Sequence, residues 1–109
     1  MIMYFFGSHH CEKCNELADK IEKMDILPPR HMKIKHIDAF ASNTQKFCDD
    51  HEVFEVPFVK IFDNNNRLIF SKKGTFDPII LWETFYPNEE ERKIAMAKAA
   101  MLKRSAMKR

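Results

Sequence analysis

The sequence predicts a single α/β domain, with a mixed sheet of four strands in the order β-α-β-α-β-β-α and an extra C-terminal helix. This prediction depends on three observations. Short, β-favouring apolar runs alternate with stretches of helical periodicity. A cluster of polar turn residues separates two strand-like segments. Residues 88–109 have helix-capping signals of their own. A chain of 109 residues fits one such domain.

The first three elements form a strand–helix–strand unit. Ile2–Phe6 is a short apolar run that Gly7-Ser8 ends, which predicts a buried strand. Apolar residues recur at helical spacing over Cys11–Asp25, and Pro28-Pro29 closes this helix. Met32–Ile37 alternates apolar and polar side chains, which predicts a second strand. Strands joined in this way favour a parallel pair with a right-handed crossover.

A hairpin is predicted in the second half of the chain. Phe58–Phe62 has the composition of a buried strand, and Arg67–Ser71 that of a second one. Asp63–Asn66 between them is a cluster of turn-forming residues, and Gly74 ends the unit. We therefore expect these two strands to pair antiparallel.

Two short helices flank the hairpin. Ser42 or Asn43 is expected to cap a helix over Thr44–His51. Asp77 is expected to cap a helix over Pro78–Phe85, because proline suits the first helical position. The apolar residues of the second helix should face the sheet, and they are Ile79, Leu81, Trp82 and Phe85.

The domain of residues 1–87 is followed by a basic helical extension over residues 88–109. Asn88 suits the N-cap, Glu91 completes a capping box, and seven basic residues stand against three acidic ones. The helix could pack back on the domain, self-associate or dock on a protein partner, or bind an acidic surface. Its acidic first turn and lack of bulky aromatic residues argue against membrane insertion. The basic residues that would bind an acidic surface are Lys98, Lys103, Arg104, Lys108 and Arg109.

Composition and cysteine number restrict the class of protein. A formal net charge of +2 is too small to indicate a nucleic-acid or membrane role for the whole chain. Three cysteines cannot all pair within one chain, and a disulfide framework normally uses more. Met1–Phe6 is too short for a signal peptide or a membrane span. We therefore expect a cytoplasmic protein, in which a close cysteine pair is more often catalytic or metal-binding than structural.

The motif Cys11-Glu12-Lys13-Cys14 follows a predicted strand and opens a predicted helix. The thiolate is the nucleophile in disulfide exchange, and the free amides and dipole of a helix N-terminus lower a cysteine pKa. A spacing of two residues brings the second sulfur round one turn. Cys11 is thus the expected attacking thiol and Cys14 the resolving thiol.

Zinc binding is the alternative chemistry for this motif, because zinc sites also use paired cysteines. Cys11 and Cys14 would then bind the metal together with His9 or His10. Adjacent histidines point apart, however, and no second cysteine pair or spaced histidine pair follows. We therefore expect no dedicated metal site and no cofactor.

The dipeptide Val56-Pro57 stands directly before the predicted strand Phe58–Phe62. Together with the cysteine motif and the order of elements, it resembles the thioredoxin/glutaredoxin superfamily. The resemblance covers Ile2 to about Phe85. It implies that Pro57 is a cis-proline beside the active-site sulfurs, and that the backbone of Val56 pairs with the substrate chain.

The sequence departs from thioredoxins at two places. Thioredoxins have Trp-Cys-Gly-Pro-Cys, whereas this chain has His10, Glu12 and Lys13 around its cysteines. Phe5 stands where thioredoxins place a buried aspartate, so Cys14 must lose its proton to another group or to solvent. The order of elements is more like that of a glutaredoxin, although neither Cys-Pro-Tyr-Cys nor a glutathione site is recognisable.

Four residues beside the sulfurs are expected to modulate their reactivity. Glu12 should oppose thiolate formation and Lys13 should favour it, and a protonated His9 or His10 would favour it too. Other candidates have simpler interpretations. Cys48 is expected to be a buried small hydrophobe, and Asp38 to cap a loop. The remaining histidines are expected on the surface or in loops, and they are His31, His36 and His51.

The expected function is that of a thiol–disulfide oxidoreductase acting on protein disulfides through Cys11 and Cys14. A flavoprotein reductase or a low-molecular-weight thiol would restore the reduced form. The alternative is a binding module of the same fold, in which the basic tail contacts a partner and the cysteines are non-catalytic or bind zinc.

Overall fold

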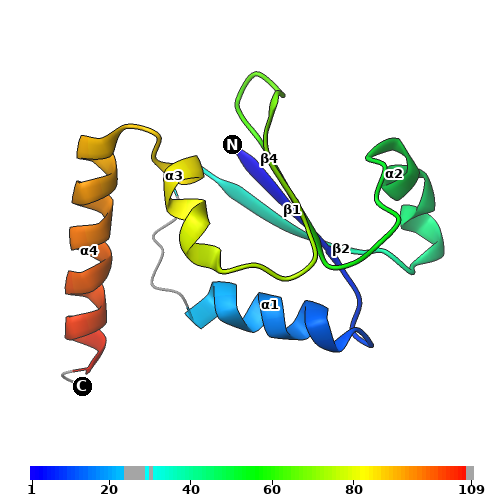
Figure 1. Cartoon of the computed structure of the whole chain (residues 1–109), viewed down its shortest axis with the longest axis horizontal. Coiled ribbons are helices and arrows are strands. Elements are labelled where there is room, and N and C mark those ends of the chain that lie inside the picture. Colours follow the sequence, from blue (N-terminus) through cyan, green and yellow to red (C-terminus); the bar gives the residue numbers. More distant parts are fainter. Residues whose placement is uncertain (24–28, 30, 108–109) are drawn as a thin grey trace.

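The computed structural model describes the backbone of residues 1–23, 29 and 31–107 (Figure 1). The predicted helix end near Asp25 and the predicted break at Pro28 lie outside the described residues. The same holds for Lys108 and Arg109, and for the side chains of Lys103 and Arg104.

Four strands form one mixed sheet in the order β2-β1-β3-β4. The central strand β1 (Ile2–Gly7) pairs in parallel with β2 (Lys33–Asp38) and antiparallel with β3 (Phe58–Phe62). β3 also pairs antiparallel with β4 (Leu68–Lys73), through a register shift at Ile61/Phe62. The predicted mixed sheet is therefore confirmed.

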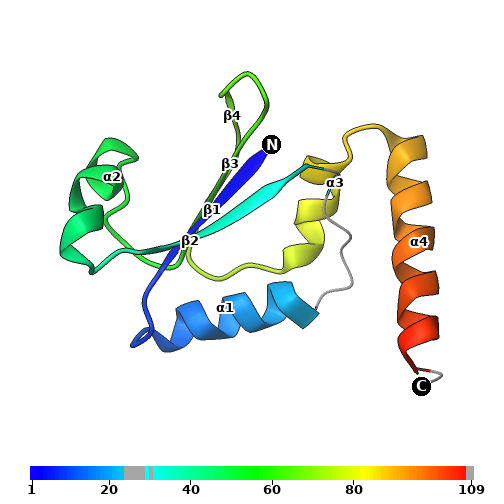
Figure 2. The same cartoon turned by 180° about the vertical axis from the view of Figure 1, so that it is seen from behind.

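Four α-helices accompany the sheet in the part of the chain that the structure describes. α1 (Glu12–Lys23) crosses from β1 to β2, and α2 (Gln45–Asp50) follows β2. α3 (Leu81–Phe85) follows β4, and α4 (Glu89–Met107) is the extra C-terminal helix. Figures 1 and 2 show α2 at one end of the molecule and α4 at the other, with the sheet, α1 and α3 between them.

The main core lies between one face of the sheet and the helices α1 and α3. Because successive side chains of a strand alternate between faces, Met3 and Phe5 point to this side together with Val59 and Ile61. Leu17 of α1 is fully buried against them. Cys14 also belongs to this cluster, as do Phe76, Leu81 and Phe85. The helix α1 is thus held on the sheet by apolar packing.

A second, smaller core lies on the opposite face of the sheet, under α2. Phe6 is fully buried there against Cys48 and Val53. His51, at the end of α2, packs against Phe47 with ring centroids 4.4 Å apart and against Tyr4 at 5.6 Å. His51 is half-buried in this ring cluster and lies in the turn after α2, which fits the expectation of a surface or loop histidine.

The helix α4 packs on α3. Ala95 and Ala99 are buried against Trp82, with Tyr86 at the rim. Two of the four side chains predicted to face the sheet are therefore placed otherwise: Trp82 faces α4, and Ile79 is 58% exposed. The cause is the first turn, because Pro78–Ile80 is a 3₁₀-helix, whose angular spacing differs from that of an α-helix.

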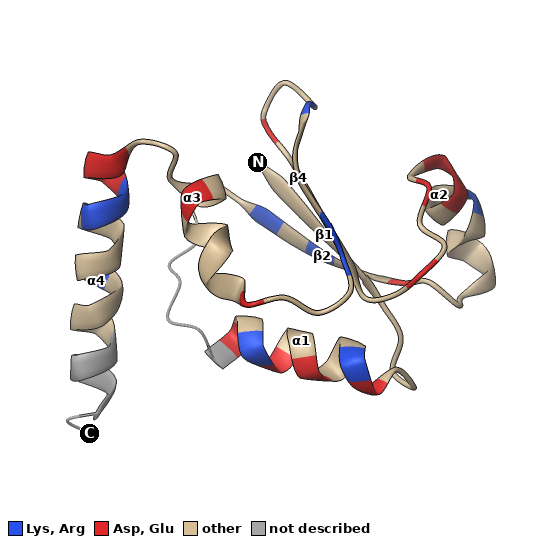
Figure 3. Cartoon of the chain, viewed as in Figure 1, with Lys and Arg blue, Asp and Glu red and all other residues tan. Residues whose placement is uncertain are grey.

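Two of the predicted helix caps are present. The carboxylate of Asp77 accepts a hydrogen bond from the N–H of Ile79 at 3.1 Å, and the side-chain oxygen of Asn88 accepts one from the N–H of Glu91 at 3.1 Å. Figure 3 shows the acidic first turn of α4, followed by basic residues.

The predicted cap at Ser42 or Asn43 is wrong. A 3₁₀ turn over Ser42–Thr44 precedes α2, and Ala41 is at its N-cap with no side-chain hydrogen bond. The hydroxyl of Thr44 instead donates to the carbonyl oxygens of Asp38 and Ala41. Those bonds hold the chain in the turn, so a side-chain cap is not needed.

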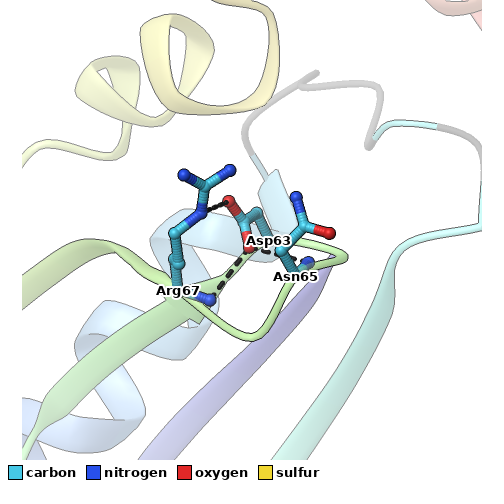
Figure 4. Close-up of polar contacts among 3 residues, drawn as sticks. All are labelled: Asp63, Asn65 and Arg67. Atoms are coloured by element: carbon cyan, nitrogen blue, oxygen red, sulfur yellow. Dashed lines mark hydrogen bonds and ion pairs between the residues drawn. The ribbon is translucent and has the colours of Figure 1, made fainter.

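The hairpin between β3 and β4 turns around Asp63 (Figure 4). Its carboxylate accepts hydrogen bonds from the N–H groups of Asn65 and Arg67, both at 2.9 Å, and forms an ion pair with the Arg67 guanidinium at 3.3 Å. The N–H of Arg67 is the main cause of the lowered pKa of Asp63. One side chain therefore fixes the turn that the Asp-Asn cluster predicted.

Candidate active site at the Cys11–Cys14 pair

The loop between β1 and α1 holds the first cysteine in place through short-range hydrogen bonds. The N–H of Cys11 donates to the carbonyl oxygen of Ser8 at 3.2 Å, and the Ser8 hydroxyl accepts from the N–H of His10 at 3.2 Å. Asn15 closes the loop, because its amide donates to the carbonyl oxygen of His9 at 3.2 Å. The backbone around the sulfurs is therefore fixed by the sequence around the motif.

Cys11 and Cys14 form a disulfide at the N-terminus of α1, with Cα atoms 5.2 Å apart. The N–H of Cys14 points at the Cys11 sulfur, at 3.1 Å. Cys11 is half-buried, whereas Cys14 is 2% exposed. The accessible sulfur is thus the one that receives a helix N-terminal amide, which is the arrangement that stabilises a thiolate.

Gly7 allows the close approach of β1 and α1 behind the disulfide. A Cβ at this position would lie 3.0 Å from Cε1 of Phe5 and 3.3 Å from the Cβ of Cys14. Phe5 itself is buried in the main core beside Cys14. An aromatic ring therefore occupies the interior next to Cys14.

The Val56-Pro57 dipeptide lies in the loop before β3, and its peptide bond is cis. Pro57 is fully buried, and its carbonyl oxygen accepts a hydrogen bond from the N–H of Gly74 at 2.8 Å. Val56 is partly buried and packs on both cores, and Cys11 packs on the rim of the main core. Val56, one of the two predicted substrate-binding residues, thus packs on the same core as the two cysteines.

The four predicted modulating residues are all exposed: His9, His10, Glu12 and Lys13. None of their side chains makes a hydrogen bond or ion pair with another residue in the described part of the chain. Their influence on the sulfurs is therefore limited to charge acting through solvent.

A small cleft of about 110 Å³ reaches Cys14, and we call it the Cys14 cleft. It brings two strand residues to the site, His36 and Asp38 of β2, which the sequence indicated only as a surface histidine and a loop cap. Alternation along β2 places both on one face, but only the pairing of β2 with β1 shows that this face borders the sulfurs. The cleft is lined by Phe5, Gly7, Ser8, His9, Cys14, Asn15, Ala18, His36 and Asp38.

Cys48 is separated from this site. It is 3% exposed and packs in the second core, on the opposite face of the sheet. Burial raises the pKa of its thiol. It is a free cysteine with the surroundings of an unreactive one.

Within the described ranges, no group of three or more His, Cys, Asp or Glu side chains is placed to hold a metal ion. Among the helices that the structure describes, none is both long and apolar enough to cross a membrane.

Comparison with known proteins supports the fold. The chain is similar to thioredoxin 1 from the thermophilic eubacterium Thermosipho africanus TCF52B, with 21% identity, a TM-score of 0.62, and coverage of 90% of this chain and 99% of that one. A structure described as that of a malarial protein matches with 15% identity and a TM-score of 0.61, over 78% of this chain and 96% of that one. The fold is thioredoxin-like. No protein-family model and no curated protein matches the sequence.

Proposed function

We propose that this protein is a thiol–disulfide oxidoreductase that reduces protein disulfides by dithiol exchange. The observation that supports this most strongly is the Cys11–Cys14 disulfide at the N-terminus of α1, where the N–H of Cys14 points at the accessible sulfur. A purely structural disulfide needs neither an accessible sulfur nor a helix amide. An exchanging pair needs both.

The reaction follows from this asymmetry. In the reduced protein, the Cys11 thiolate attacks one sulfur of the substrate disulfide, and the other substrate sulfur leaves as a thiolate. Cys14 then attacks the Cys11 sulfur and displaces the second substrate sulfur, which re-forms the Cys11–Cys14 disulfide. Two electrons pass from the protein to the substrate.

The substrate chain would lie beside the loop before β3. Val56 packs on the same core as Cys11, and the backbone that leads from it into β3 could pair with an extended peptide. The protein partners are therefore disulfide-containing chains and, for return of the two electrons, a flavoprotein reductase or a low-molecular-weight thiol. A reductant of this kind belongs in a reducing compartment such as the cytoplasm.

Reduction of insulin disulfides by dithiothreitol tests the proposal. Natural protein should accelerate the reaction, and Cys11→Ser should abolish the acceleration because it removes the attacking thiolate. Cys48→Ser is the matched control, since it removes a thiol of the other core, and its rate should be close to that of the natural protein. Equal rates for natural protein and Cys11→Ser would contradict the proposal.

The alternative function is that of a binding module. It is favoured by the apolar side chains that α4 leaves exposed, which are Ile94, Met96, Met101 and Leu102. In that case the cysteines would take no part in catalysis, and the natural protein would not accelerate insulin reduction. Removal of residues 88–109 would change its association with itself or with a partner.

A further inference from the structure

The resolving cysteine has no obvious group to take its proton. Cys14 must become a thiolate to attack the mixed disulfide, yet it is 2% exposed. Among the described residues no polar or charged side chain is buried, and the ring of Phe5 lies in the core next to Cys14. The proton must therefore leave through a path that begins at Cys14 and ends at an accessible acceptor.

The Cys14 cleft is such a path. Its volume of about 110 Å³ has room for a short chain of water molecules. Three titratable side chains besides Cys14 line it, namely His9, His36 and Asp38. The acceptor should be one of these three.

Asp38 and His9 are the weaker candidates. The carboxylate of Asp38 already accepts a hydrogen bond from the N–H of Phe40 at 3.0 Å, which holds the turn after β2. The His9 side chain lies on the loop and makes no hydrogen bond, ion pair or ring contact with another described residue that would hold its ring at the cleft.

His36 is held at the cleft by the sheet. It is the β2 partner of Phe5 in the β1–β2 register, and the centroids of the two rings are 5.5 Å apart. Within the described part of the chain, no group hydrogen-bonds to either of its ring nitrogens. An imidazole accepts and releases protons near neutral pH. A ring that is held at the cleft and whose nitrogens make no hydrogen bond is therefore suited to accept the proton of Cys14.

We propose that His36 accepts, through water in the Cys14 cleft, the proton that Cys14 loses when it resolves the mixed disulfide. Cys14 gives its thiol proton to water and water gives one to His36. The Cys14 thiolate forms a bond to the Cys11 sulfur, and the Cys11–substrate bond breaks. The substrate leaves as a thiolate, and imidazolium His36 returns its proton to solvent. The inference rests on the proposed function.

Few other titratable side chains lie around His36, and each of them can influence how the rate of the resolving step depends on pH. His9 and Asp38 share the cleft. Glu22 of α1 lines an adjoining apolar groove that also includes His36. The residues of β1 and α3 that border His36 through these two cavities are not titratable.

The resolving step can be measured with 5,5′-dithiobis(2-nitrobenzoate), an aromatic disulfide that releases a coloured thiolate. Reduced protein should release one thiolate as Cys11 attacks and a second, in a first-order phase, as Cys14 resolves. Cys14→Ser should lose the second phase, which assigns it. Stopped-flow traces would be recorded for the natural protein, His36→Gln, His9→Gln and Lys35→Gln. Lys35 is the matched control, because it precedes His36 on β2 and points to the opposite face.

At pH 7 the second phase of His36→Gln should be slowed about tenfold, and that of His9→Gln and Lys35→Gln less than about twofold. The difference in rate between the natural protein and His36→Gln should disappear near pH 10, where a thiol ionises without a general base. Added imidazole should restore the rate of His36→Ala.

A rate for His36→Gln equal to that of the natural protein at pH 7 would overturn the inference. So would an equal slowing at every pH without rescue by imidazole, because that indicates a structural effect. Failure of the proposed function is recognised separately, since the natural protein would then show no resolving phase and no insulin reduction.

Discussion

Cys11 and Cys14 belong to one motif but have different surroundings, and their reactivity should differ accordingly. Only Cys11 combines partial exposure with a helix N-terminal amide directed at its sulfur. In the reduced protein near neutral pH, iodoacetamide should therefore label Cys11 faster than Cys14 and Cys48. Peptide mapping by mass spectrometry after short labelling times checks the order. Preferential labelling of Cys48 would overturn the assignment of the nucleophile.

Gly7 is the residue at which the close packing behind the disulfide can be tested. An added Cβ would lie 3.0 Å from the Phe5 ring, inside a buried core, so Gly7→Ala should lower the free energy of unfolding by about 1–3 kcal/mol. Urea unfolding of the reduced protein measures this. Ser8→Ala, at the neighbouring, less buried position, is the comparison for the loss of one hydrogen bond without added volume, because the Ser8 hydroxyl accepts from the N–H of His10. An unchanged midpoint for Gly7→Ala would show that the ring of Phe5 gives way without cost.

At the scale of single elements, periodicity in the sequence predicted the strands well. The strand Phe58–Phe62 has the predicted bounds, and β2 begins one residue later than predicted. Two features could not be predicted. The 3₁₀ geometry of Pro78–Ile80 rotates Ile79 outward, and periodicity assumes regular α-helix. The place of His36 beside the sulfurs depends on which strand pairs with Phe5, and this is a tertiary contact.

The junction of α2 with the sheet should make stability depend on pH through His51. Burial, and next the Lys60 ammonium, lower the pKa of His51 in the folded protein. The unfolded chain then binds a proton more readily, so the free energy of unfolding should decrease as the pH falls below about 6.5 and show no His51 effect above it. Urea unfolding of natural protein and His51→Phe at about pH 7.5 and 5.5 measures this. An equal loss of stability in both proteins would contradict it.

At the scale of the whole molecule, the described side chains of α4 make a small apolar contact with α3. Ala95 and Ala99 cover Trp82, and the disulfide, Pro57 and the sheet all precede this helix in the chain. The sequence predicted the helix and its Asn88 cap from local signals alone. It could not predict that Trp82 is the docking residue, because the apolar residues of α4 wrap around the helix.

Removal of residues 88–109 should therefore leave a folded domain that still reduces insulin. Trp82 would lose its cover, and we expect the free energy of unfolding to decrease by about 1–3 kcal/mol. Circular dichroism melting measures the loss of stability, size-exclusion chromatography shows whether the domain is folded and unaggregated, and the insulin assay measures its activity. Ala95→Glu is a full-length variant that disturbs the same contact. An unfolded or aggregated truncation would show that α4 is part of the core.

The claim that Cys11 attacks substrate and Cys14 resolves is tested most directly by trapping the mixed disulfide. Reduced Cys14→Ser, mixed with a disulfide-containing protein, should form a covalent complex through Cys11 that dithiothreitol releases, because nothing remains to attack the mixed disulfide. Cys11→Ser should form no such complex. Non-reducing electrophoresis and mass spectrometry of the linked peptide identify the bond. A complex formed through Cys14 or Cys48, or none with Cys14→Ser, would contradict the account.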